Sequence, residues 1–171
     1  HVRSRRQRQM CIRDRLYTSD ATRRVTVSRG FNLVVFAADG SVAASTSYDV
    51  YGSYAAQILA LKNALNALAA NVFFALIGCD NILNFGTAND ADTVAVKNFL
   101  LNAGANSDFL TASVQNRIPV FVGRNGIGSN SGLMRLITST TNQAWIDVPI
   151  SIVGGKVVGV DGASGLSLIH I

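Results

Sequence analysis

The dipeptide Asp39-Gly40 lies between two stretches that both favour extended backbone. Residues 31–36, Phe-Asn-Leu-Val-Val-Phe, are rich in branched and aromatic side chains, and residues 41–48 read Ser-Val-Ala-Ala-Ser-Thr-Ser-Tyr. Asp-Gly between two such runs is a strong signal for a tight hairpin turn. The sequence therefore predicts an antiparallel β-hairpin over residues 31–48, followed by a helix that begins near Ser53.

Two further stretches have the periodicity of helices that bury one face. Residues 54–70 place Ile58, Leu61, Leu65 and Leu68 at three- and four-residue spacing, which predicts a helix. Residues 91–103 predict a second helix, in which Asp90 caps the N-terminus and Gly104 occupies the position just past the C-terminus.

The remaining apolar runs have the length of strands. Val72–Ile77 is continuously apolar, so both faces of that strand should be covered. Further strands are expected over residues 118–122, 134–139, 144–153 and 156–160, with polar loops over residues 78–89 and 123–132. The predicted fold class is α+β: a two-layer, sandwich-like, mainly antiparallel β-sheet with two or three helices packed against it. We expect Phe36, Leu65, Phe74 and Phe99 to be buried together between sheet and helices.

Both ends of the chain look foreign to this domain. Residues 8–21 and residues 166–171 resemble translated sequencing adapter, so we interpret residues 1–21 and 166–171 as non-native and residues 22–165 as a single domain. The alternative is a genuine basic N-terminal arm that binds phosphate.

The charge of the chain is concentrated in its N-terminal segment. The whole chain carries +5, but residues 1–24 hold eight arginines and two aspartates, so the remainder has a net charge of −1. That remainder offers no electrostatic reason to bind nucleic acid or an anionic membrane. No apolar run is long enough to span a bilayer, and we expect no membrane insertion.

The composition of residues 22–165 indicates where such a domain would work. There is no Glu, polarity comes from Asn, Ser, Thr and Gly, and Cys79 is the only cysteine in this range. A single cysteine cannot form an internal disulfide. This composition is typical of extracellular or virion proteins, and we expect such a setting.

Three short motifs in order resemble those of the ILEI/PANDER family, the interleukin-like inducers of epithelial–mesenchymal transition and the pancreatic-derived factor. They are Arg29-Gly30-Phe31-Asn32, Tyr48-Asp49-Val50-Tyr51, and the run Phe121-Val122-Gly123-Arg124-Asn125-Gly126. The resemblance covers residues 28–128. It implies a non-catalytic domain, of the kind that also occurs as an appendage of bacteriophage tail proteins.

Patterns that suggest catalysis or metal binding have simpler explanations. The loop over residues 123–132 lacks the Lys-Ser/Thr of a phosphate-binding loop, and a surface loop is the better interpretation. Asp90 and Asp92 are better explained by helix capping than by a metal, and Cys79 has no histidine in residues 22–165. Asp49 should cap or brace the loop after its strand, and the alternative is contact with a ligand. We predict no enzyme activity, no catalytic residue, no metal and no cofactor.

The remaining polar candidates are Asp80, Asn81, Asn84, Arg117 and Trp145. Asp80 follows the third predicted strand and Arg117 precedes the fourth, so their side chains would line one shallow cleft if these strands are neighbours. An Asp–Arg pair among uncharged amides suits a sugar, whereas the alternative is a plain surface salt bridge. Trp145 is expected in the core rather than at the site. The resemblance adds that the stem domain of the glycosyltransferase that extends O-mannose with N-acetylglucosamine has a similar fold and binds sugar, and that its relatives carry an acidic residue where this chain has Asp80.

We therefore expect a binding module of a phage tail or bacterial surface protein, with a host-surface glycan as ligand and other tail or surface subunits as partners. Asp80, Asn81, Asn84 and Arg117 are the predicted ligand-binding residues. The alternative function is a purely structural assembly domain of a tail protein.

Overall fold

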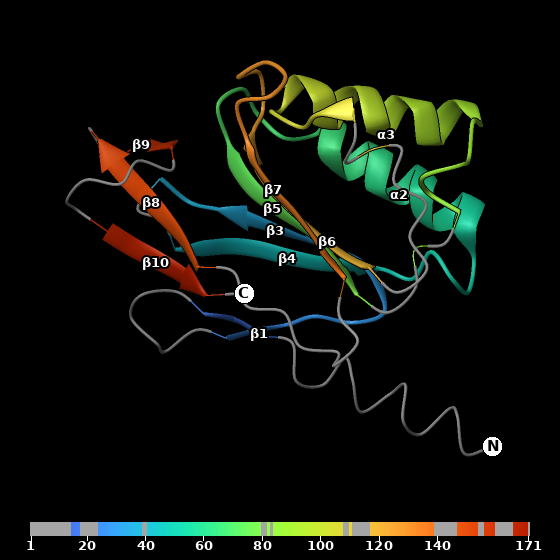
Figure 1. Cartoon of the computed structure of the whole chain (residues 1–171), viewed down its shortest axis with the longest axis horizontal. Helices are drawn as coiled ribbons and strands as arrows, with labels where there is room; N and C mark the ends of the chain where they lie inside the picture. The colour runs from blue at the N-terminus through green and yellow to red at the C-terminus, as the bar shows by residue number, and fades with distance from the viewer. Residues whose placement is uncertain are drawn as a thin grey trace.

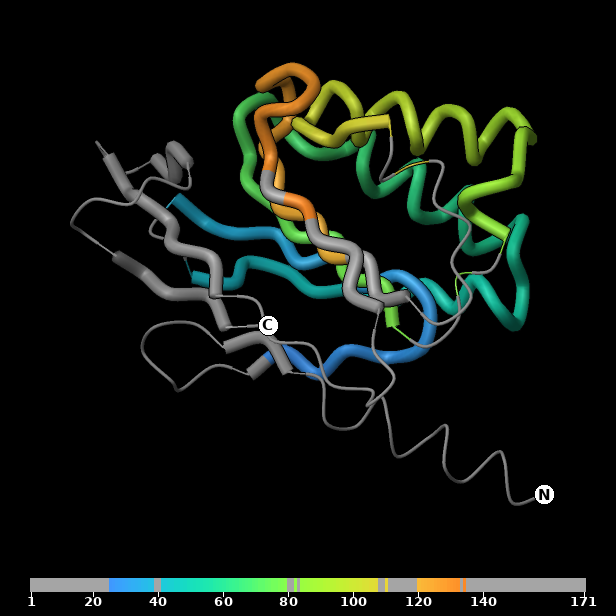
Figure 2. Tube along the Cα trace, in the orientation of Figure 1, coloured from blue at the N-terminus to red at the C-terminus, as the bar shows by residue number. Residues whose placement is uncertain are grey.

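The computed structural model describes residues 15–17, 24–38, 41–79, 82, 84–107, 110, 117–138, 147–153, 156–159 and 166–170. Its central element is a five-stranded antiparallel sheet in the order β4-β3-β5-β6-β7. The strands are β3 (Gly30–Phe36), β4 (Val42–Tyr48), β5 (Phe73–Cys79), β6 (Arg117–Arg124) and β7 (Leu133–Thr138). Two helices, α2 (Tyr54–Asn66) and α3 (Ala91–Asn102), cover one face of this sheet (Figures 1 and 2). The α+β class is thus confirmed.

A second sheet pairs five shorter strands in the order β2-β1-β10-β8-β9. These strands are β1 (Arg15–Tyr17), β2 (Arg24–Thr26), β8 (Asp147–Val153), β9 (Lys156–Gly159) and β10 (Leu166–His170). In Figure 1, β8 and β10 lie on the side of the central sheet away from the helices. β1 and β10 fall in the segments that we interpret as adapter, and that interpretation stays a prediction.

The hairpin predicted around Asp39-Gly40 is confirmed in its strands. β3 and β4 pair antiparallel from Phe31 opposite Tyr48 to Val35 opposite Ala44. The register then shifts by one residue, so Ala43 is the extra residue of a β-bulge. Asp39 and Gly40 lie outside the described residues. β8 and β9, which correspond to the strands predicted over residues 144–153 and 156–160, pair antiparallel.

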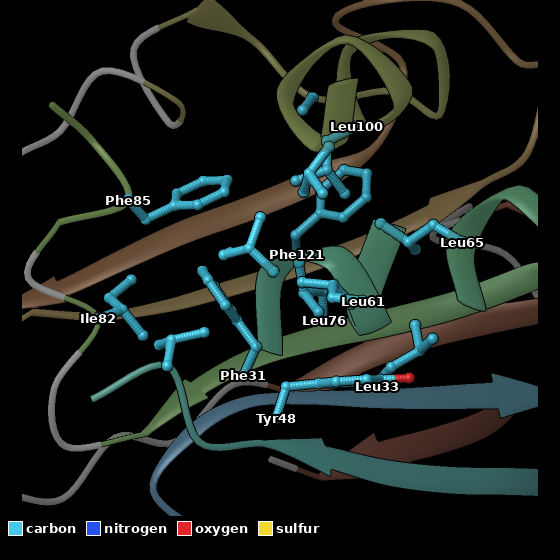
Figure 3. Close-up of a cluster of buried hydrophobic side chains, with 14 of the residues drawn as sticks. Phe31, Leu33, Tyr48, Leu61, Leu65, Leu76, Ile82, Phe85, Leu100 and Phe121 are labelled. Carbon is cyan, nitrogen blue, oxygen red and sulfur yellow. The ribbon is translucent and has the colours of Figure 1, made fainter. Parts of the chain in front are cut away.

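The main core lies between the helices and the central sheet (Figure 3). Phe31 and Phe74 enter it from the sheet, and Leu61, Leu65 and Leu100 enter it from the helices. The ring of Phe74 meets that of Phe121 with centroids 5.6 Å apart. These side chains remove a continuous apolar surface from water, which is the main force that holds the two layers together.

The expected group of four buried residues is only partly right. Leu65 and Phe74 are fully buried in the core, and Phe99 is half-buried against it, with its ring centroid 6.0 Å from that of Phe74. Phe36 is buried but lies outside this cluster. Successive side chains of a strand point to opposite faces, so Phe36 shares the far face of β3 with Asn32 and Val34.

Several predicted element boundaries were wrong. Gly78 and Cys79, assigned to a loop, extend β5, because they pair with Phe31 and Gly30 of β3. Gly123 and Arg124, also assigned to a loop, extend β6 by pairing with Phe74 and Phe73. The ends of β5 and β6 are set by pairing with neighbouring strands, and a local sequence pattern holds no information about that pairing.

The helix ends show the same dependence on neighbours. α2 ends at Asn66 rather than at residue 70, and the side-chain amide of Asn125 donates to the carbonyl of Leu68 just beyond its end (2.9 Å). Ser53 lies at the N-cap of α2, where the helix was expected to begin, but its side chain makes no capping hydrogen bond. By contrast, the backbone amide of Thr93 donates to Asp90 (2.9 Å), and Gly104 has φ +115°, so both caps predicted for α3 are confirmed.

Candidate functional site

Antiparallel pairing gathers several strand ends at one end of the central sheet. β3 begins there at Gly30, opposite Cys79 at the end of β5, and β4 ends there at Tyr48. β6 begins at the same end with Arg117. Residues that flank these positions in the sequence are therefore brought near one another, although they come from four different strands.

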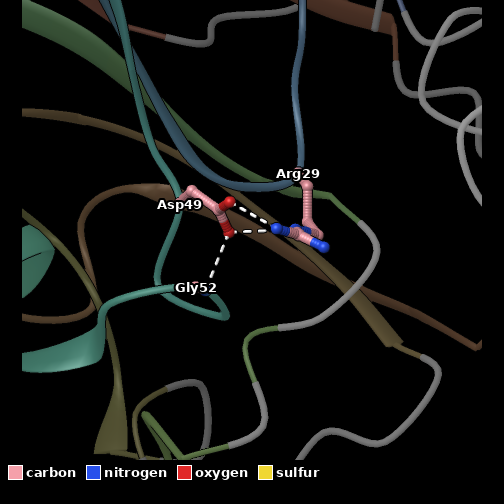
Figure 4. Close-up of polar contacts among 3 residues, drawn as sticks. All are labelled: Arg29, Asp49 and Gly52. Atoms are coloured by element: carbon pink, nitrogen blue, oxygen red, sulfur yellow. Dashed lines mark hydrogen bonds and ion pairs between the residues drawn. The ribbon is translucent and has the colours of Figure 1, made fainter.

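An ion pair links the residues that flank β3 and β4 at this end (Figure 4). Nε of Arg29 donates to Oδ1 of Asp49 (2.9 Å), and Nη2 donates to Oδ2 (2.5 Å). The backbone amide of Gly52 also donates to Oδ1 (3.2 Å). The predicted bracing role of Asp49 is confirmed, since its carboxylate ties the turn after β4 to the segment before β3.

The electrostatics of this pair follow from its geometry. Hydrogen bonds from the Arg29 side chain, with smaller contributions from backbone amides, lower the pKa of Asp49 below its ordinary value. The two side chains are 41% and 44% exposed, so water screens much of their attraction. The bidentate geometry fixes the orientation of both groups more than it stabilises the fold.

Tyr51 completes this surface. Tyr51 is 61% exposed, the highest fraction among the large hydrophobic residues whose side chains the structure describes. The guanidinium carbon of Arg29 lies 4.7 Å from the centre of the ring, within cation–π range. Arg29, Asp49, Tyr51 and Gly52 are called the strand-end surface below.

Of the four predicted ligand-binding residues, the structure describes Asn84 and the backbone of Arg117. β5 and β6 are neighbours, as the prediction required, and their ladder runs to Ile77 opposite Val120. Arg117 is the first residue of β6, but its side chain lies outside the described part. Asp80, Asn81 and Trp145 also lie outside the described residues.

Asn84 is exposed in a turn that is anchored on both sides. Its carbonyl accepts from the amide of Ala88 (2.7 Å), and the neighbouring Phe85 ring packs on Phe31 with centroids 4.9 Å apart. From α3, Nζ of Lys97 donates to the carbonyls of Gly86 (3.1 Å) and Ala88 (3.0 Å). Burial lowers the pKa of Lys97. The turn is thus held against the core and α3.

The glycine-rich loop after β6 uses its amides within the protein. The amides of Gly128 and Gly132 donate to the carbonyls of Asn102 and Gly104 at the end of α3 (both 2.9 Å). Amides bound in this way are not aimed at a phosphate, which supports the surface-loop interpretation. The capping interpretation of Asp90 is confirmed, and Asp92 pairs with Lys62 of α2 (2.5 Å).

The described residues hold no group of three or more His, Cys, Asp or Glu side chains able to bind a metal ion, and none of their helices is long and apolar enough to cross a bilayer. Cys79 is buried at the end of β5.

Arg29 and Tyr51 were not among the residues predicted for the site. The signal was present, because the hairpin predicted around Asp39-Gly40 brings the segment before β3 beside the segment after β4. What the pattern did not contain was the bidentate geometry and the exposure of the ring. No protein-family model matches this chain, and no curated protein sequence matches it either.

Proposed function

We propose that this chain is a non-catalytic binding module of a virion, such as a phage tail, or of a bacterial surface protein, and that its ligand is a glycan. The observation that carries the proposal is the strand-end surface, where the exposed ring of Tyr51 lies beside the Arg29–Asp49 pair. The resemblance to ILEI/PANDER domains agrees with this proposal.

The chemistry of the strand-end surface suits a sugar. An exposed aromatic ring offers a flat apolar face on which the C–H face of a pyranose can pack, and the phenol adds a polar group at its rim. The fixed carboxylate and guanidinium present acceptors and donors at defined positions for neighbouring hydroxyl groups. Because residues 25–171 have a net charge of −1, a neutral or amino sugar fits better than a polyanion.

We include Asp80 and Arg117 in the proposed site because of their positions in the sequence. Asp80 follows Cys79, the last residue of β5, and Arg117 opens β6 at the same end of the sheet. In this proposal they extend the strand-end surface with a second carboxylate and a second guanidinium, and Asn81 and Asn84 add amides. Single sugar sites are commonly weak, and repeated display on a virion would strengthen them.

The assembly function is the second candidate, and the β4 edge favours it. β4 lies at the edge of the central sheet, and five consecutive residues, 43–47, are exposed. A strand of this kind offers a backbone edge to another protein strand.

The test is a glycan array probed with the biotinylated full chain multimerised on streptavidin. Three variants, Tyr51→Ala, Asp80→Ala and Arg117→Ala, are compared with Leu59→Ala, which removes an exposed apolar side chain of α2. We expect the parent and Leu59→Ala to bind the same sugars and Tyr51→Ala to lose at least about tenfold in apparent affinity, as expected when a packed ring is removed.

Three results would contradict the proposal. A blank array for the parent chain would favour the assembly function, and hydrolysis of a bound sugar would show an enzyme. If the parent binds and Tyr51→Ala binds equally well, the strand-end surface is not the site.

A further inference from the structure

β4 is an edge strand whose outer side pairs with none of the other described strands. In the central sheet it pairs with β3 on one side and ends the order on the other. Residues 43–47 are all exposed, although successive side chains point to opposite faces. Both faces of the middle of β4 are therefore accessible, together with its outer backbone edge.

From Ala44 to Tyr48, this edge has none of the usual protection against pairing. Natural edge strands carry Lys, Pro or inward-pointing charges, or are interrupted by bulges. The sequence of β4, Val-Ala-Ala-Ser-Thr-Ser-Tyr, has no charge and no proline. Its one irregularity is the bulge at Ala43, and the ladder from Ala44 to Tyr48 is regular. A regular stretch of five residues is thus available as a template for another strand.

We propose that β4 pairs with β4 of a second copy of this chain, antiparallel and about a two-fold axis at Thr46. In this register Thr46 faces Thr46 of the second copy, and Ser45 faces Ser47. Thr–Thr and Ser–Ser neighbours across strands form favourable side-chain pairs, and small residues let the backbones approach. The axis makes the interface self-complementary, as in most protein dimers.

The absence of charge argues for a second copy as the occupant. Like charges directly opposite each other destabilise a strand pair, and a two-fold axis always places a residue near its own equivalent. A strand without charge pairs with itself without this cost. The paired segment is short compared with standard protein interfaces, so the dimer should form reversibly.

The dimer goes beyond the proposed sugar binding and does not depend on it. It would carry two strand-end surfaces on one particle, which is the simplest route from a weak single site to stronger attachment. The test of the dimer uses no sugar. A failure of the glycan proposal would therefore not affect its result, and a failure of the dimer would not affect the glycan array.

The first experiment measures the mass of the full chain by analytical ultracentrifugation over a wide concentration range. The weight-average mass should rise from the monomer value of 18.1 kDa toward twice that value. Thr46→Lys places two lysines directly opposite each other and should weaken dimerisation at least about tenfold. Ala56→Lys adds the same charge at an exposed position on α2 and should not.

A parent chain that stays monomeric at every concentration would overturn the proposal and leave an unrelated protein strand as the partner of β4. Dimerisation unchanged by Thr46→Lys would overturn it too, because the interface would lie elsewhere. Equal loss in both lysine variants would show a general charge effect rather than an edge interface. Circular dichroism of each variant confirms that the fold is retained.

The second experiment tests the register by disulfide trapping in a Cys11→Ser background. Directly opposed residues of an antiparallel pair have Cα atoms close enough for a disulfide, whereas diagonal neighbours lie at or beyond its limit. Thr46→Cys should therefore form covalent dimers several-fold faster than Ser45→Cys under mild oxidation. Equal or reversed rates would overturn the two-fold axis at Thr46.

Discussion

Arg29 and Asp49 form a two-pronged ion pair that joins the start of β3 to the turn after β4. They lie twenty residues apart in the sequence, within the short motifs Arg29–Asn32 and Tyr48–Tyr51. The same motifs supply a second junction, because Gly30 lies so close to the carbonyl of Tyr48 that a side chain there would collide with it. The motifs thus meet in space.

Asn32 should be one of the most sensitive polar residues of the domain. Its side chain is fully buried, accepts from Ser28 N (2.8 Å) and Ser47 Oγ (2.7 Å), and donates to the carbonyl of Ser28 (2.7 Å). Asn32→Ala should lower the free energy of unfolding by about 2 kcal/mol, because partners of a buried group are left unsatisfied. Urea unfolding measures this loss. Ser47→Ala removes one partner at an exposed site and should cost less than half as much, and equal costs would contradict this account.

Gly30 should tolerate no side chain, for two reasons. Its φ is +96°, and an added Cβ would lie 2.0 Å from the carbonyl oxygen of Tyr48. Gly30→Ala should destabilise the fold by about 3 kcal/mol or more. Gly126 is the matched control, since its φ is +87° but nothing lies within 4 Å of an added Cβ. Gly126→Ala should cost about 1 kcal/mol from backbone strain alone. Similar losses in thermal unfolding would show that crowding at Gly30 is unimportant.

Phe74→Ala should remove a central part of the core. The ring is fully buried and contacts those of Phe99 and Phe121. We expect a loss of about 3–5 kcal/mol in the free energy of unfolding, from lost transfer energy and the cavity left behind. Leu59→Ala, at an exposed position of α2, should change it by less than about 0.5 kcal/mol. A cost below about 1 kcal/mol for Phe74→Ala would contradict the observed burial.

The fold should lose stability in acid, in part through Asp49. Folding lowers the pKa of this carboxyl, chiefly through hydrogen bonds from Arg29, and lowers that of Asp90 through Thr93. Their contributions are therefore present above the ordinary carboxyl pKa of 3.8 and are lost as the pH falls through the lower folded values.

Asp49→Asn should reduce stability at pH 7 by less than about 1 kcal/mol, because the pair is exposed. It should also flatten part of the decline between about pH 5 and pH 2 in urea titrations. Asp90→Asn should flatten a separate part of the decline, because Asn does not titrate but can still cap α3. An unchanged acid profile in both variants would show that other carboxyls control it.

Removing residues 1–21 and 166–171 tests the adapter interpretation. β1 and β10 lie in these segments and pair within the second sheet, whereas the described strands β3–β7 pair only among themselves. We expect the shortened chain to keep a cooperative thermal transition, with stability within about 1 kcal/mol of the parent. Loss of that transition would show that β1 and β10 are part of the folded domain.

The sequence by itself determined the elements whose signals are local. The β3–β4 hairpin followed from a turn dipeptide between two strand-forming runs, and α3 followed from apolar spacing between Asp90 and Gly104. Leu65 and Phe74 were placed in the core for the same reason, because hydrophobic periodicity records which face of an element avoids water.

The tertiary structure alone decided what depends on neighbours distant in sequence. Phe36 is buried on the far face of β3, and Gly78 and Cys79 belong to β5 because β3 supplies their pairing partners. The stacking of Arg29 on Tyr51 and the open edge of β4 are relations between segments. Local propensity sets what a segment can form, whereas the surrounding chain sets which face is covered and which hydrogen bonds are made.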